Sequence, residues 1–201
     1  MKQIIIFTIV ISLISFKLNA QVENDTLIFG LKNTKIFKES IFYELNYVEY
    51  YTPKHIKSKI KPTFMIRSES QVGISIRPSV VKSNSYASRF ETEMFIEDMV
   101  GKNFLQIGEY DFDNDKISEL VIAFGVRGTG LLCFIYKYHE PANIVDADRD
   151  ENWEQIGTFE YGYSDPKYIS FVEKSKIYFP VGSQGYSEGF IYVDNKFVKF
   201  Q

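Results

Sequence analysis

Cysteine and histidine are scarce in this chain, and both shortages restrict its chemistry. Cys133 is the only cysteine of the 201 residues, so no disulfide can form within the chain. Because it lies in the apolar run Leu131–Ile135, we interpret it as a buried hydrophobic residue and not as a nucleophile. The two histidines, His55 and His139, belong to no His-Glu-x-x-His or Cys/His zinc pattern.

Sequence motifs of catalysis are also missing. The chain has no Gly-x-Ser-x-Gly segment, which would place a serine nucleophile on a sharp turn. Two facing carboxylates, as in a glycoside hydrolase, stay open as an alternative, because such pairs come from strands that are distant in sequence. We therefore expect a protein that is not an enzyme.

Long apolar segments are confined to the N-terminus. Lys2 precedes the apolar run Ile4–Phe16, and Leu18-Asn19-Ala20 approximates a small-residue cleavage site before Gln21. This pattern predicts a signal peptide at residues 1–20 and a mature chain exported to the periplasm or the extracellular space. No segment reaches the roughly 20 apolar residues of a transmembrane helix, so we expect no membrane span.

The mature chain has no excess of basic residues. Loss of the predicted signal peptide removes Lys2 and Lys17 and no acid, which leaves 21 basic and 26 acidic residues and a net charge of −5. Nucleic acid prefers a basic surface, so we expect no nucleic-acid partner.

Several of the acids are concentrated in one short segment. From residue 111 to 119 the chain reads Asp-Phe-Asp-Asn-Asp-Lys-Ile-Ser-Glu, with acids at positions 1, 3, 5 and 9. Alternate carboxylates in a turning loop, completed by a backbone carbonyl, suit a hard cation with oxygen ligands. The alternative is an Asp- and Asn-rich turn between two strands. We predict a calcium (Ca2+) site whose ligands are Asp111, Asp113, Asp115, Ile117 and Glu119.

The segment resembles the loops of the FG-GAP and VCBS-type repeats, integrin-like calcium-loop modules of exported bacterial proteins. In that family the loop reads Asp-x-Asp/Asn-Gly-Asp-Gly-x-x-Asp/Glu-Leu and lies between two strands. The resemblance implies the same five ligands and a strand from Leu120 to Phe124. Asn114 and Lys116 stand where the family has glycine, and a left-handed conformation is costly for lysine. This departure predicts weaker affinity than in a glycine-containing loop.

A second segment repeats the acidic spacing. Acids again occupy positions 1, 3, 5 and 9, at Asp146, Asp148, Asp150 and Glu154. The segment contains no glycine and has Arg149 inside it, so it is either a second, degenerate metal site or a solvated acidic loop.

Most of the remaining chain is rich in Ile, Val, Phe and Tyr, in short segments divided by Gly, Pro, Asn, Asp and Ser, which is typical of β-structure. We expect strands at residues 41–51, 63–67, 72–77, 104–109, 119–124, 131–138, 153–161, 168–172, 176–179, 189–193 and 196–200. Tight hairpin turns are expected at residues 125–130, 173–176 and 194–196, and a wider loop at residues 183–189.

One short helix is expected, because Ser88-Arg-Phe-Glu91 has the form of a capping box and starts an amphipathic stretch that ends at Val100. The predicted fold is mainly β, with antiparallel hairpins in a propeller-like, barrel or sandwich arrangement. We expect a single β-rich domain at residues 21–201, with a possible subdivision near residues 80–103.

Two non-catalytic functions remain open. In the first, calcium holds the structure of a module that binds a protein or glycan partner. Aromatics such as Tyr161, Tyr163 and Tyr186 either stack on sugar rings in such a module or, as most aromatics in sheets do, alternate along strands and pack in the core. In the second, the protein is an exported enzyme inhibitor or immunity-type protein, because some periplasmic lysozyme inhibitors have a similar compact β-fold with one calcium loop. For a binding loop we name Ser183, Gln184 and Tyr186, from the predicted wide loop.

Overall fold

Three β-sheets make up the part of the chain that the structure, a computed structural model, describes: residues 27–37, 44, 47–59, 62–69, 73–79, 103–126, 130–142, 152–162 and 169–200. Sheet A has the spatial order β1 (Ile28–Phe29), β10 (Ser170–Glu173), β11 (Lys176–Val181), β12 (Tyr186–Val193), β13 (Lys196–Phe200). Sheet B has the order β2 (Lys32–Phe37), β6 (Asn103–Tyr110), β7 (Glu119–Val126), β8 (Gly130–Tyr138), β9 (Trp153–Gly162). Sheet C has the order β3 (Val48–Tyr51), β4 (Thr63–Glu69), β5 (Gly73–Ser79).

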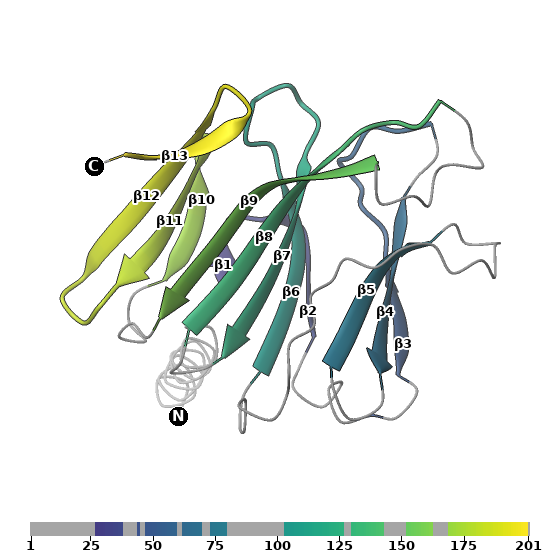
Figure 1. Ribbon diagram of the computed structural model, residues 1–201, viewed down its shortest axis with the longest axis horizontal. Coiled ribbons are helices and arrows are strands. Elements are labelled where there is room, and N and C mark those ends of the chain that lie inside the picture. The colour runs from purple at the N-terminus through teal and green to yellow at the C-terminus, as the bar shows by residue number, and fades with distance from the viewer. Residues whose placement is uncertain are drawn as a thin grey trace, which may run out of the picture.

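Sheet B lies between the other two sheets, as Figure 1 shows. One of its faces packs on sheet C in a core that includes Phe64, Ile122 and Trp153, and the other packs on sheet A in a core that includes Val121, Cys133 and Phe179. The arrangement is therefore sandwich-like and mainly antiparallel, and none of the described sheets closes into a barrel. This confirms the predicted β class.

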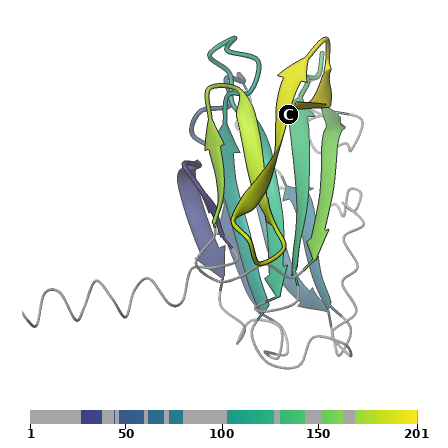
Figure 2. The same ribbon diagram turned by 90° about the vertical axis from the view of Figure 1, so that its left-hand side faces the viewer.

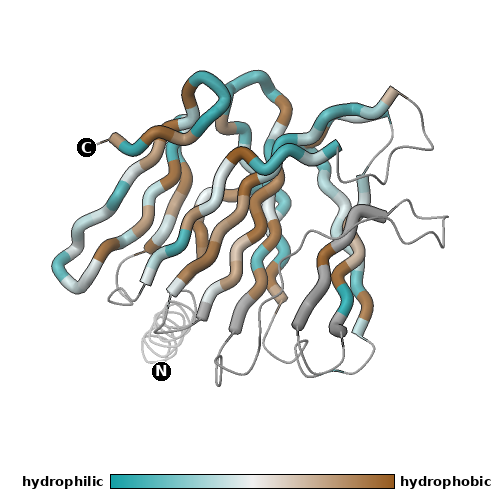
Figure 3. The backbone as a smooth tube through the Cα atoms, in the orientation of Figure 1, coloured by the Kyte–Doolittle hydropathy of each residue, from teal (hydrophilic) through white to brown (hydrophobic). Residues whose placement is uncertain are grey.

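The burial of both faces of sheet B at its central strand β7 explains the sequence of that strand. A strand with one solvated face alternates apolar and polar residues, whereas a strand covered on both faces is apolar throughout. All five residues from Leu120 to Phe124 are at most 2% exposed. Figure 3 shows this apolar character along β7 and much of β8.

Two buried polar side chains fasten neighbouring segments to β6. Gln106 accepts a hydrogen bond from the backbone N–H of Ile28 at 2.8 Å and donates one to the carbonyl of Ile28 at 2.9 Å, which ties β1 of sheet A to sheet B. Glu109 is 0% exposed and accepts hydrogen bonds from four donors. These are Asn33 Nδ2, Tyr51 Oη and the backbone N–H groups of Lys54 and His55.

The predicted hairpins are largely confirmed. β10 and β11 are joined by Lys174 and Ser175, and β12 and β13 by Asp194 and Asn195. All four residues have φ between 50° and 64°, as a two-residue type I′ turn requires. The third predicted turn, residues 125–130, lies where β7 and β8 pair, and Val126 at its start pairs with Gly130 at its end.

Four features of the prediction are wrong. β1 and β2 were not expected, because β1 has two residues and β2 reads Lys-Asn-Thr-Lys-Ile-Phe, a polar edge strand without apolar alternation. The strand expected from residue 41 begins only at Val48. The wide loop at residues 183–189 is a tight turn, because β12 begins at Tyr186 and pairs with Val181.

The fourth difference is that β11 continues through Pro180, where we expected it to end at Phe179. Proline lacks the N–H that a sheet needs from an interior residue. On the side of β11 that faces β10, the pairing stops before Pro180, because β10 begins only at Ser170. No residue of β10 therefore needs an N–H from Pro180.

The predicted signal peptide, the predicted helix from Ser88 and the possible subdivision near residues 80–103 lie outside the described residues. Among the residues that are described, none belongs to a helix with the length and apolar character needed to cross a membrane.

Candidate metal centre

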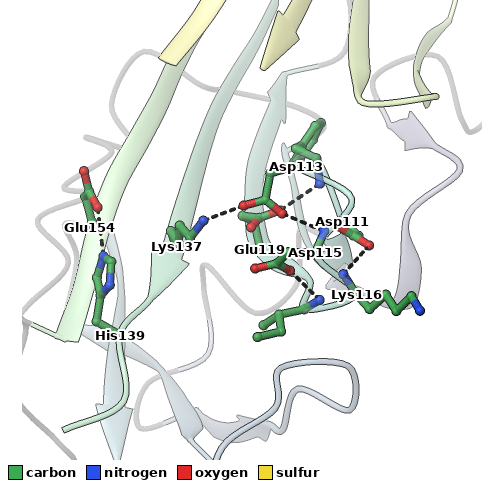
Figure 4. A network of polar contacts seen from close by, with 10 residues as sticks. Asp111, Asp113, Asp115, Lys116, Glu119, Lys137, His139 and Glu154 are labelled. Atoms are coloured by element: carbon green, nitrogen blue, oxygen red, sulfur yellow. Dashed lines mark hydrogen bonds and ion pairs between the residues drawn. The ribbon is translucent and has the colours of Figure 1, made fainter. Parts of the chain in front are cut away.

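The predicted metal ligands lie in residues 111–119, the connection between β6 and β7, which we call the aspartate loop. Asp111, Asp113 and Asp115 turn toward one another, and one carboxylate oxygen of each lies within 4.8 Å of the other two. Figure 4 shows this convergence. Three acids at alternate positions reach one point because the chain between them coils instead of extending. The group could therefore hold a metal ion.

The backbone of the loop has the conformation that the family pattern implies. Asn114 and Lys116 have φ of 60° and 71°, at the two positions where glycine stands in the FG-GAP and VCBS-type loops. Asparagine tolerates this left-handed region, whereas lysine is strained in it.

Hydrogen bonds hold the carboxylates in place. Asp111 Oδ2 accepts from the N–H of Lys116 at 3.0 Å, Asp113 Oδ1 from the N–H of Asp115 at 3.1 Å, and Asp115 Oδ1 from the N–H of Ile117 at 2.6 Å. The other oxygen of Asp111, Oδ1, is buried and has no hydrogen-bond partner. A buried carboxylate oxygen without a partner is unfavourable, and a bound cation would satisfy it.

Glu119, the fourth predicted acidic ligand, lies outside the converging group. It is 1% exposed, and its Oε2 accepts a hydrogen bond from the N–H of Phe112 at 2.8 Å. Burial raises the pKa of Glu119 to about 7, and the nearby charge of Asp113 adds to the rise. Ile117, the predicted carbonyl ligand, lies within the loop, where its own N–H donates to Asp115.

A cationic side chain that the sequence did not reveal borders the cluster. Lys137 on β8 forms an ion pair with Asp113 Oδ2, and its Nζ lies 2.5 Å from that oxygen. Burial acts to raise the pKa of Asp113, but the hydrogen bonds from Lys137 and Asp115 outweigh it and lower the pKa below its ordinary value. The bond to Asp113 raises the pKa of Lys137 in turn. Lys137 therefore neutralises one of the three converging charges. Only strand pairing reveals this, because Lys137 follows Asp113 by 24 residues.

The aspartate loop also fastens sheet A to sheet B. The side-chain amide of Asn114 donates to Ser175 Oγ in the β10–β11 turn. The ring of Phe112 is fully buried and packs edge to face on Phe197 of β13, with centroids 5.1 Å apart. An ion that orders this loop would therefore also stabilise the packing of the two sheets.

The second predicted metal site is not brought together by the described residues. Asp146, Asp148 and Asp150 lie outside them. Glu154 is exposed on β9 and bonds to His139 Nε2 at 2.8 Å (Figure 4).

The residues named for a binding loop are exposed. Ser183 and Gln184 lie in the turn of the β11–β12 hairpin, and Tyr186, the first residue of β12, is 68% exposed. They form a narrow hairpin tip and not a wide loop.

Comparison of the chain with models of protein families, with curated proteins and with solved structures found no match.

Proposed function

We propose that this chain is an exported, non-catalytic binding protein in which the aspartate loop holds a structural calcium ion. The observation that carries the proposal is the convergence of Asp111, Asp113 and Asp115, with one buried oxygen of Asp111 left without a partner. Calcium is the preferred ion because the ligands offered are carboxylate oxygens, which suit a hard cation. Export would expose the site to the high calcium concentrations in which extracellular modules bind.

The role of the ion follows from the position of the loop. Phe112 and Asn114 contact sheet A, whereas the strands that flank the loop belong to sheet B. Calcium would therefore act on the relative packing of the two sheets, and the protein would bind its protein or glycan partner through surfaces that this packing creates.

The test is thermal unfolding of residues 21–201 in EDTA and in millimolar calcium. Calcium at about 100 times its dissociation constant adds about 2.7 kcal/mol to stability, which raises Tm by several degrees. Asp111→Asn should lose this rise. Asp194→Asn is the matched control, because Asp194 is an exposed acid in another turn, and it should keep the rise. An equal Tm with and without calcium in the unmodified protein would contradict the proposal.

An enzyme inhibitor is the second candidate, and the β11–β12 hairpin favours it. All residues from Val181 to Ser187 are exposed, and a narrow tip with an exposed tyrosine can enter the cleft of an enzyme. Inhibition of a lysozyme by the unmodified protein, with inhibition weakened by Tyr186→Ala, would support this function over the first.

A further inference from the structure

A cleft of about 440 Å³ opens between β9 at the edge of sheet B and strands β12 and β13 of sheet A. Its volume falls in the range of about 300 to 1,000 Å³ that is typical of small-molecule sites. β9 and β13 are the edge strands of their sheets and lie side by side (Figures 1 and 2), and residues of both line the cleft. Tyr161, named above for stacking on sugar rings, lines it, whereas none of the predicted metal ligands or binding-loop residues does.

The lining combines aromatic rings with exposed polar groups. Phe159 is almost completely buried, and Tyr161, Phe190 and Phe197 are half-buried. The polar lining residues are Thr158, Glu160 and Lys196, all exposed.

A network of polar side chains continues from Tyr161, one of the aromatic residues that line the cleft. The hydroxyl of Tyr161 donates to Glu188 Oε2 at 3.0 Å, and Lys199 Nζ lies 2.6 Å from Glu188 Oε1. Both hydrogen bonds lower the pKa of Glu188, with that from Lys199 contributing most, so the carboxylate is ionised at neutral pH.

The charges around the cleft are balanced. Glu160 and Lys196 line the cleft, and the paired Glu188 and Lys199 adjoin it through the hydroxyl of Tyr161. Any charged ligand would lie near groups of its own sign, whereas a hydroxyl group can donate to the carboxylates and accept from the ammonium groups. The cleft therefore suits an uncharged molecule with many hydroxyl groups and an apolar face for the rings.

We propose that this cleft is the binding site for a neutral glycan. A pyranose ring has C–H groups on its faces, which pack on the aromatic rings, and hydroxyl groups around its perimeter, which bond to the polar residues. The inference rests on the proposed function: it names a neutral glycan as the class of partner and this cleft as the surface that binds it. It also connects the two sites, because Phe197 lines the cleft and packs on Phe112 of the aspartate loop.

The test uses uniformly 15N-labelled residues 21–201 in calcium, titrated with maltotetraose, cellotetraose and chitotetraose at millimolar concentration. Amide resonances of residues 156–161 and Phe197 should shift on addition of at least one of them. Glu160→Gln and Lys196→Ala each remove one hydrogen-bonding group from an exposed position and should weaken binding about fivefold. Glu173→Gln and Lys174→Ala, at exposed positions in the β10–β11 turn, are the matched controls and should bind as the unmodified protein does.

Three results would overturn the assignment: no shift with any of the three oligosaccharides, shifts outside the cleft, or equal affinity in the cleft and control variants. Failure here is separate from failure of the calcium site, because the thermal test contains no sugar. A calcium-dependent rise in Tm without oligosaccharide binding would reject the glycan cleft alone.

Discussion

The ring of Phe112, at the second position of the aspartate loop, packs on the ring of Phe197 in β13, with 81° between the ring planes. This contact joins the candidate metal centre of sheet B to the aromatic cleft at the edge of sheet A. It makes the conformation of the loop and the packing of the two sheets interdependent.

Phe112→Ala should lower the free energy of unfolding by about 3 to 5 kcal/mol, because it removes a fully buried ring and leaves a cavity. Urea denaturation measures the change. Phe29→Ala is the control, since Phe29 is 38% exposed and its truncation should cost much less. Similar losses in both variants would show that Phe112 has no special role in joining the sheets.

Lys137→Met should increase calcium affinity several-fold. The ammonium group of Lys137 forms an ion pair with Asp113 and adds positive charge beside the site. A bound cation therefore has to compete with it for the carboxylate. Isothermal titration with calcium measures the affinity. Lys199→Met, which removes a lysine paired with Glu188, should leave calcium binding unchanged. Equal or weaker affinity in Lys137→Met would mean that the lysine does not oppose the ion.

The stability of the metal-free protein should fall as pH rises from about 4.5 to about 7. In this window Glu119 is ionised in the unfolded chain but still protonated in the folded one, because its folded pKa is raised to about 7. The unfolded state therefore binds fewer protons, and the loss amounts to about 3 kcal/mol at most. Urea denaturation in EDTA at several pH values measures this slope.

Glu119→Gln is the matched variant for the pH experiment. Its side-chain oxygen can still accept the hydrogen bond from Phe112, but it does not titrate. The slope between pH 4.5 and 7 should become shallower in this variant. An unchanged slope would assign the pH dependence to another group.

Glu109→Ala should destabilise the protein by about 3 to 5 kcal/mol. The substitution leaves Asn33, Tyr51 and two backbone N–H groups without the carboxylate that accepts their hydrogen bonds. The exposed Glu160 offers the comparison, and Glu160→Ala should change stability by no more than about 0.5 kcal/mol. Chemical denaturation of both variants decides whether Glu109 holds these segments together.

Local sequence determined the strands and the tight turns of this protein. A continuous apolar run such as Leu120–Phe124 has few alternatives to a strand buried on both faces, and Asp194-Asn195 readily adopts the positive φ of a type I′ turn. The convergence of Asp111, Asp113 and Asp115 is also local, because nine consecutive residues contain the whole loop. These features follow from interactions between near neighbours in the chain, which a sequence pattern records directly.

The tertiary structure alone decided what surrounds these elements. Lys137 reaches Asp113 only because β7 and β8 pair, and the cleft exists only because β9 of sheet B lies beside β12 and β13 of sheet A. The polar strand β2 forms because it pairs with β6, where Glu109 accepts a hydrogen bond from Asn33. Such contacts depend on which strands become neighbours in space, and the energy of that choice is spread over both cores, so no single segment of the sequence carries it.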